Sequence, residues 1–209
     1  GLLNPRAPVH VLEYGVPNSA RRVERPGHGK PPIVFGFIGA LMPHKGAHVA
    51  VEAFRGLKPD RARLILWGNP DADPVYSARL REHAEDDVVG LMGSFEEDRR
   101  PEVLASFDVL IGPSVGLESF GIVAREAMAA GVPVIASRRG ALEELQIDEI
   151  CGATFAAEDA VELRRVIDRL IENPETIDTW RKALPEVATA EEHADAVEEI
   201  YRQVLREAG

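Results

Sequence analysis

Two glutamates eight residues apart, Glu118 and Glu126, have the surroundings in this chain that best suit binding chemistry. The stretch from 118 to 126 reads Glu-Ser-Phe-Gly-Ile-Val-Ala-Arg-Glu and follows a short apolar segment at 109–111. This pattern predicts a buried strand, a loop and a helix that begins near Gly121. A glycine at a helix N-terminus lets a phosphate approach the free backbone N–H groups, and the helix dipole favours the anion.

The two carboxylates are expected at different depths, with Glu118 in the loop and Glu126 inside the helix. They could accept hydrogen bonds from two sets of hydroxyls, such as a ribose and a hexose joined by a diphosphate. Lys45 follows an earlier apolar strand and would project toward the same crevice, where a lysine can neutralise a diphosphate leaving group. The alternatives are that Glu118 caps the helix, that Glu126 is a solvated surface acid and that Lys45 is a solvated surface lysine.

Six short apolar segments could form the strands that position these residues. They are Ile33–Ile38, Arg63–Trp67, Val88–Met92, Val109–Ile111, Val132–Ala136 and Cys151–Phe155. Helical stripes alternate with them, over 47–57, 163–171 and 190–205. The alternation predicts an α/β fold, a single Rossmann-like doubly wound domain of about six parallel strands with helices on both faces. Such sheets bind ligands at the carboxyl ends of their strands.

The 209 residues suffice for one domain with a sizeable core. Residues 1–30, rich in Pro, Gly and Arg, are expected to form a linker that is ordered only in part. Residues 31–209 are expected to form the ligand-binding domain, which ends in a long helix.

The formal net charge of −11 leaves no general electrostatic footprint for nucleic acid or anionic lipid. Any bound anion must therefore be held by a local pocket. The single cysteine, Cys151, excludes an intrachain disulfide and is expected to be a small buried residue. Since the apolar runs are shorter than the roughly 18 residues of a membrane span and no signal peptide is seen, we expect a cytoplasmic protein.

Three other motifs point to chemistry that their surroundings do not favour. The stretch from Gly39 to Gly46 resembles a phosphate-binding Walker A loop, but it lacks the second glycine and the Ser or Thr that would bind magnesium. The Asp71-Ala-Asp73 pair could hold a divalent metal, although its neighbours favour a turn that caps the next helix. His44 and His48 have no third ligand at suitable spacing. We therefore expect neither an ATPase nor a metal site.

The motifs closely resemble the donor domain of family 4 glycosyltransferases, retaining enzymes of the GT-B fold. The resemblance covers about residues 10–207, and the Glu-x7-Glu motif is its most specific part. It is carried by Leu12-Glu-Tyr-Gly15-Val16, Phe35-Gly-Phe-Ile-Gly39, Pro43-His-Lys45-Gly46, Gly68-Asn69, Pro113-Ser114, the Glu118-x7-Glu126 pair and Gly131-Val-Pro-Val-Ile-Ala-Ser137.

The resemblance implies a role for each matching residue. Glu126 would bind the ribose hydroxyls of the donor, Lys45 the diphosphate, and Glu118 would face the transferred sugar at the reacting centre. The backbone amides of Gly121, Ile122 and Val123 would contact the phosphates and the sugar.

Three further matches are expected around these residues. Gly39 ends the first strand beside the diphosphate, and the loop at 92–95, with Gly93 and Ser94, would lie beside the base. Glu144 matches an acid that recurs in the family and would support the site at most.

The resemblance also implies the reaction of the intact protein. A hexose would pass from a nucleotide diphosphate sugar to an acceptor hydroxyl with retention, without a cofactor or essential metal. The acceptor would be bound by an N-terminal domain outside this chain, so the present domain is expected to bind donor without turnover. Peripheral membrane contact of the intact enzyme stays open, and no nucleic-acid partner is expected.

Ala40 departs from the family pattern, which often has an arginine there that shares the diphosphate with the lysine. One positive charge fewer favours the alternative of a non-catalytic nucleotide-sugar-binding module. An epimerase of the same fold is a further alternative. The final helix in such enzymes crosses back toward the other domain, so its apolar face (Val197, Tyr201, Val204) is expected to be partly exposed.

Overall fold

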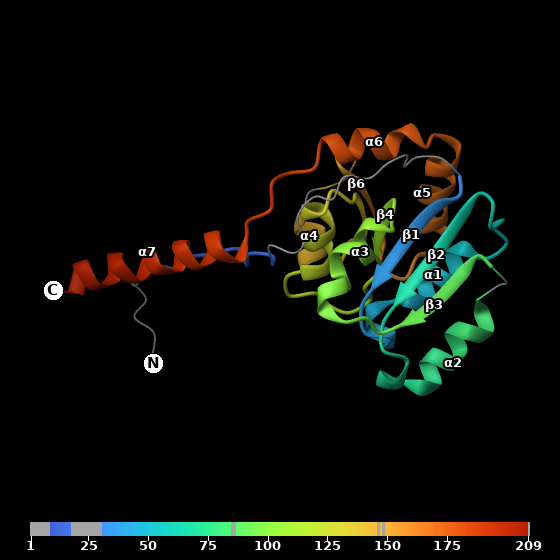
Figure 1. Ribbon diagram of the computed structural model, residues 1–209, viewed down its shortest axis with the longest axis horizontal. Helices are drawn as coiled ribbons and strands as arrows, with labels where there is room; N and C mark the ends of the chain where they lie inside the picture. Colours follow the sequence, from blue (N-terminus) through green and yellow to red (C-terminus); the bar gives the residue numbers. More distant parts are fainter. Residues whose placement is uncertain (1–8, 18–30, 85–86, 146, 148, 209) are drawn as a thin grey trace.

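Six parallel strands form one sheet at the centre of the molecule, in the order β3-β2-β1-β4-β5-β6 (Figure 1). The computed structural model describes residues 9–17, 31–84, 87–145, 147 and 149–208. The strands are β1 Ile33–Ile38, β2 Ala62–Trp67, β3 Val89–Gly93, β4 Val109–Gly112, β5 Val134–Ser137 and β6 Gly152–Phe155. All six predicted strands are confirmed, with ends displaced by two residues at most.

Helices cover both faces of the sheet. Their bounds are α1 Ala47–Phe54, α2 Pro74–His83, α3 Arg100–Ala105, α4 Ile122–Ala129, α5 Ala160–Glu172, α6 Glu175–Lys182 and α7 Ala190–Ala208. Side chains that alternate along the strands build two cores. One core contains residues of α1, α2, α5 and α6, and the other contains residues of α3 and α4. The predicted doubly wound fold is thus confirmed.

Two of these helices, α3 and α6, are absent from the sequence prediction. Each is short and buries only two side chains, Val103 and Leu104 in α3 and Ile177 and Trp180 in α6. So few apolar residues cannot display a helical period in the sequence.

The strand order reverses between β1 and β4. The chain passes outward from β1 through β2 to β3 and then returns to place β4 on the other side of β1. The loops that follow β1 and β4 therefore leave the sheet side by side, where open α/β sheets form a ligand-binding crevice.

The segment before the sheet and the start of α7 lie against each other. Val16 forms an isolated parallel bridge with Thr189, and its N–H donates to the Ala188 carbonyl at 2.8 Å. Beyond this contact α7 extends away from the sheet (Figure 1), which leaves Tyr201 and Val204 exposed as expected. Within the described ranges, the helices include none long and apolar enough to cross a membrane. Residues 1–8 and 18–30 of the expected linker lie outside the described residues, and the division at residue 30 stays a prediction.

Candidate functional site

The loop after β1 is fixed against the loop after β4 by backbone contacts. Gly46 adopts a positive φ of 73°, and a Cβ atom at this position would lie 1.8 Å from the Pro113 carbonyl oxygen. Only glycine accommodates both conditions. On the other side of this contact, the His44 carbonyl accepts hydrogen bonds from the N–H groups of Val115 and Gly116, both at 2.9 Å. The two loops therefore form one rigid floor at the point where the strand order reverses.

Lys45 and Glu118 meet across this floor. Lys45 Nζ donates to Glu118 Oε1 at 2.7 Å, and the Ser114 hydroxyl donates to the same oxygen at 2.6 Å. Ser114 is held in turn, because the fully buried Ser137 donates its hydroxyl to the Ser114 carbonyl at 2.7 Å. Both serines belong to motifs that carry the family resemblance, but the sequence did not predict these hydrogen bonds. Their hydrogen bonds give the Glu118 side chain one defined position.

These contacts also set the charge of Glu118. Burial acts to raise its pKa, but the hydrogen bonds from Lys45 and Ser114 and the lysine charge together outweigh burial and lower the pKa below its ordinary value. Glu118 is therefore ionised at neutral pH. The alternatives of a helix-capping Glu118 and a solvated Lys45 are both wrong, since α4 has no side-chain cap and Lys45 is paired.

The N-terminus of α4 opens onto the same crevice. Gly121 precedes the helix with a φ of 71°, and the N–H groups of the first turn, including those of Ile122 and Val123, have no carbonyl four residues earlier within the helix. Arg125 fixes the approach to this turn. Its buried side chain donates to the Phe120 carbonyl, and its guanidinium carbon lies 4.0 Å from the centre of the Phe120 ring.

One cavity of about 90 Å³ collects most of the predicted site residues. It is lined, among others, by Gly39, Lys45, Glu118, Gly121, Ile122 and Val123. Because typical ligand pockets measure several hundred Å³, this cavity can enclose only part of a nucleotide sugar. Its cation, carboxylate and helix N-terminus suit the part that carries the phosphates and the sugar.

Glu126 lies outside this cavity lining, on the side of α4 that faces α3. Its side chain is only 5% exposed, and its Oε2 accepts a hydrogen bond from Arg100 Nη1 at 2.9 Å. Burial raises the pKa of Glu126 above its ordinary value, and the charge of Arg100 opposes that rise only in part. The alternative of a solvated surface acid is wrong. Arg100 stands 26 residues away from Glu126 in the sequence, and no motif predicted this partner.

Gly93 and Ser94 also lie outside the cavity lining, at the end of β3. The Gly93 carbonyl accepts the Gly68 N–H at 2.8 Å, and Ser94 is exposed. The next residue, Phe95, packs edge-on against Trp67 with ring centres 5.4 Å apart. The assignment of this loop to the base of a nucleotide stays a prediction.

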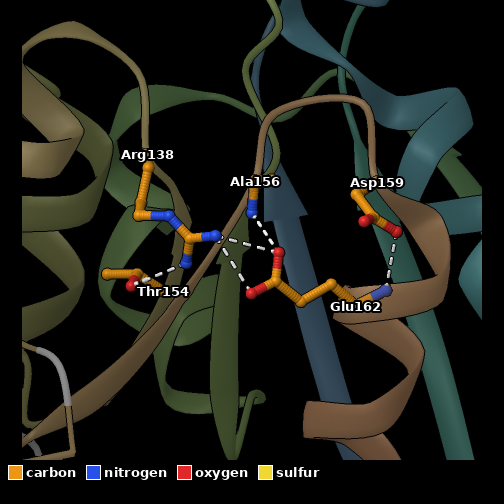
Figure 2. A network of polar contacts seen from close by, with 5 residues as sticks. All are labelled: Arg138, Thr154, Ala156, Asp159 and Glu162. Atoms are coloured by element: carbon orange, nitrogen blue, oxygen red, sulfur yellow. Dashed lines mark hydrogen bonds and ion pairs between the residues drawn. The ribbon is translucent and has the colours of Figure 1, made fainter.

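The arginine that follows β5 does not replace the missing charge at Ala40. Figure 2 shows Arg138 turned toward α5, where its Nη2 donates to both carboxylate oxygens of Glu162 at 3.0 Å. Its Nη1 donates to the Thr154 hydroxyl at 3.3 Å, and Glu162 also accepts the Ala156 N–H at 2.6 Å. The Arg138 guanidinium is thus paired with Glu162 at the start of α5.

The motifs expected to be inactive have structural roles. The Asp73 carboxylate accepts the Tyr76 N–H at 2.9 Å and caps α2, which confirms the capping interpretation of the acidic pair. His48 Nδ1 lies 2.8 Å from the Tyr76 hydroxyl. In the part of the chain that the structure describes, no three His, Cys, Asp or Glu side chains are grouped to hold a metal ion.

Two further residues named in the sequence analysis lie away from the cavity lining. Cys151 is buried as predicted, and Glu144 is exposed in the 3₁₀ helix Gly140–Leu145.

A doubly wound parallel sheet that presents a lysine, a carboxylate and a helix N-terminus at its switch point is suited to bind an anionic ligand there. The chain belongs to the family described as glycosyl transferases group 1, whose profile matches residues 20–187.

Curated relatives agree with this assignment. The chain is 35% identical over 153 residues to D-inositol 3-phosphate glycosyltransferase of Corynebacterium glutamicum, a match that covers 68% of this chain and 36% of the relative. It is 33% identical over 135 residues to phosphatidyl-myo-inositol mannosyltransferase of Mycobacterium leprae, covering 63% of this chain and 35% of the relative. The chain thus spans well under half the length of these relatives.

Solved structures share the fold. Anabaena HepE (Alr3699) in complex with UDP-glucose matches with a TM-score of 0.73 and 24% identity, covering 82% of this chain and 49% of that protein. Sucrose-phosphate synthase of Thermosynechococcus elongatus matches with a TM-score of 0.71 and 26% identity, covering 84% of this chain and 46% of that enzyme.

Proposed function

We propose that this chain binds the nucleoside diphosphate sugar of a retaining hexosyltransferase, and that the intact protein transfers the hexose to an acceptor hydroxyl. The observation that carries the proposal is the meeting of Lys45, Glu118 and the first turn of α4 in one cavity. An ammonium group and a helix N-terminus suit a diphosphate, while a carboxylate suits sugar hydroxyls and developing positive charge.

In the proposed complex the diphosphate lies between Lys45 and the amides of Gly121, Ile122 and Val123. As the bond from the anomeric carbon to the diphosphate oxygen breaks, negative charge grows on that oxygen. The fixed ammonium and N–H groups then stabilise the transition state more than the ground state. The ionised Glu118 faces the positive charge that develops on the sugar, and Glu126 accepts hydrogen bonds from the ribose.

Without donor, Lys45 is already paired with Glu118. A bound diphosphate must therefore share the lysine with Glu118 or displace it, and the remaining interactions of Glu118 with Ser114 keep the carboxylate in place. The acceptor is bound outside this chain, so we expect the domain alone to bind donor without transferring sugar. We further propose that the reaction needs no essential metal and takes place in the cytoplasm.

A non-catalytic nucleotide-sugar-binding module is the second candidate, because of Ala40. Among the described residues that line the cavity, Lys45 is the only cation, and its charge is balanced by Glu118. Slow hydrolysis of the sugar nucleotide separates the two candidates. Glu118-dependent hydrolysis by the intact protein supports the enzyme, whereas tight binding by the intact protein without any hydrolysis supports the module.

Thermal unfolding with UDP, GDP and ADP and with their glucose and mannose derivatives tests the binding site. We expect one nucleotide series to raise the Tm, and Lys45→Met and Glu126→Gln each to weaken that shift. Glu172→Gln, which changes an exposed acid at the end of α5, should leave the shift unchanged. The same titration with EDTA and with Mg²⁺ tests the expectation that no metal is needed. A Tm that responds to none of the nucleotides would contradict the proposal.

A further inference from the structure

Arg100 is fixed between the 3₁₀ turn Glu97–Arg99 and α4. Its Nε and Nη2 donate to the two carboxylate oxygens of Glu97 at 2.6 and 2.7 Å, while Nη1 donates to Glu126 at 2.9 Å. The guanidinium carbon also lies 5.5 Å from the centre of the Phe95 ring. A planar guanidinium held by two carboxylates and a ring has little freedom to turn. Arg100 therefore links the start of α3 rigidly to the middle of α4.

The two oxygens of the Glu126 carboxylate have different surroundings. Oε2 is bonded to Arg100, whereas Oε1 accepts no hydrogen bond from the residues that the structure describes. One oxygen of this nearly buried side chain is thus anchored, and the other has no hydrogen bond from a described residue.

Burial and the charges of Arg100 and Glu97 together decide whether Glu126 is ionised. Burial favours the neutral acid, and Glu97 adds a negative charge nearby, while Arg100 favours the carboxylate. On α4 itself, the neighbouring Arg125 is directed to the Phe120 carbonyl and to Glu13. Arg100 is consequently the cation that keeps Glu126 available as a charged acceptor.

We propose that Arg100 is a positioning residue for donor recognition, which orients Glu126 so that its free oxygen accepts hydrogen bonds from the ribose hydroxyls. The inference rests on the proposed function, because it takes Glu126 as the ribose ligand. Arg100 acts through Glu126 and makes no contact with the donor. Its removal should therefore affect recognition of the ribose hydroxyls and leave the phosphate contacts intact.

The test compares a nucleoside diphosphate with its 2′-deoxy and 3′-deoxy forms by calorimetry, using whichever of UDP, GDP and ADP binds the wild type. The wild type should prefer the ribose form about tenfold or more, since a hydrogen bond to a charged group is lost in one deoxy form. In Arg100→Met this preference should fall below about threefold. Arg99→Met, which removes the same charge from a mostly exposed neighbour, should keep the preference.

The pH dependence supplies a second readout. Nucleotide binding should weaken as the pH falls through the pKa of Glu126, because the protonated acid is a poorer acceptor. Loss of Arg100 raises that pKa, so the acid limb of the binding curve should move to higher pH in Arg100→Met. Arg100→Lys retains a charge and should show an acid limb near that of the wild type, with a ribose preference between the two.

The outcomes separate the two proposals. If the wild type binds no nucleoside diphosphate, the proposed function fails, and the role of Arg100 fails with it. If the wild type binds but Arg100→Met loses the same affinity for ribose and deoxyribose forms, Arg100 contacts the phosphates or the base directly, and the positioning role is overturned. Should Arg100→Met fail to fold, an unchanged ribose preference in Arg100→Lys overturns it equally, since a lysine cannot hold both Glu97 and Glu126.

Discussion

The two glutamates of the Glu-x7-Glu motif lie at opposite ends of one loop-and-helix segment and have opposite electrostatic surroundings. One carboxylate oxygen of Glu118 accepts hydrogen bonds from Lys45 and Ser114, and the pKa of Glu118 is lowered. Glu126 is more deeply buried and shares its single arginine with Glu97, and its pKa is raised. The difference shows that a short carboxylate motif does not define the charge state of its members. The elements that pack beside each carboxylate define it.

The two glutamates also differ in the kind of contact that surrounds them. The surroundings of Glu118 are built from two loops that touch through backbone atoms, whereas those of Glu126 are built from two helices that touch through long side chains. Backbone contacts cannot adapt to a substitution, while the side chains around a helix–helix contact can partly repack when one of them is replaced. Substitutions in the Glu118 region should therefore have the larger effects.

Gly46→Ala should produce the largest effect, because it disrupts the contact between the two loops. The new Cβ would lie 1.8 Å from the Pro113 oxygen and would have to adopt a φ of 73°. We expect a loss of about 3–4 kcal/mol in the free energy of unfolding, measured with urea. Gly56→Ala is the matched control, since Gly56 has a φ of 72° and a Cβ atom added there would meet no heavy atom within 4 Å, and it should cost about 1 kcal/mol. Equal losses in the two variants would mean that the loop contact is unimportant.

Lys45→Ala comes next and tests binding at the Glu118 end. Removal of the only cation among the described residues that line the cavity should weaken nucleoside diphosphate binding roughly 30–100-fold in calorimetry at neutral pH. Lys45→Arg should recover part of the affinity. An affinity for the diphosphate that is unchanged in Lys45→Ala would remove Lys45 from the site.

The pH dependence of stability should distinguish the two glutamates by sign. The folded-state pKa of Glu118 lies below its unfolded value, so this residue stabilises the fold above the unfolded pKa of about 4.3, and the contribution is lost as the pH falls through the folded pKa. Glu118→Gln should therefore lose about 1–2 kcal/mol at pH 7 and show a flatter acid profile.

Glu126→Gln should behave in the opposite way. The folded-state pKa of Glu126 lies above its unfolded value, so the ionised residue costs stability at neutral pH, and this cost disappears as the pH falls below both values. Urea unfolding at pH 7 should show equal or greater stability for this variant, and no gain near pH 4. A loss at pH 7 as large as that of Glu118→Gln would erase the contrast between the two carboxylates.

Ala40→Arg should have the smallest effect, because it adds a charge to a site that already has one. An arginine after Gly39 can approach the diphosphate beside Lys45, and we expect affinity for the nucleotide to rise about three- to tenfold. Ala40→Met, of similar length without charge, is the control and should leave the affinity unchanged. Equal affinities in the two variants would show that position 40 lies out of reach of the phosphates.

The sequence sufficed for the sheet and for placing Lys45 and Glu118 at one crevice, but not for the pairing of their charges. β1 was predicted residue for residue, because a continuous apolar run between turn residues leaves one interpretation. Lys45 and Glu118 were both predicted to face one crevice, yet their ion pair joins residues 73 apart and depends on how two loops meet. The burial of Glu126 was missed because α3, too short to be predicted, carries the arginine that covers it.

The contact between the first described segment and α7 bears on the order of folding. The His193 ring is bonded to the Glu13 carbonyl at 2.8 Å, and these residues stand 180 apart in the sequence. Closing so long a loop costs chain entropy that is repaid only after the intervening sheet has formed. This contact should therefore be absent from the transition state for folding. A His193→Ala substitution, which removes the ring that reaches the Glu13 backbone carbonyl, would then speed unfolding and leave the folding rate unchanged.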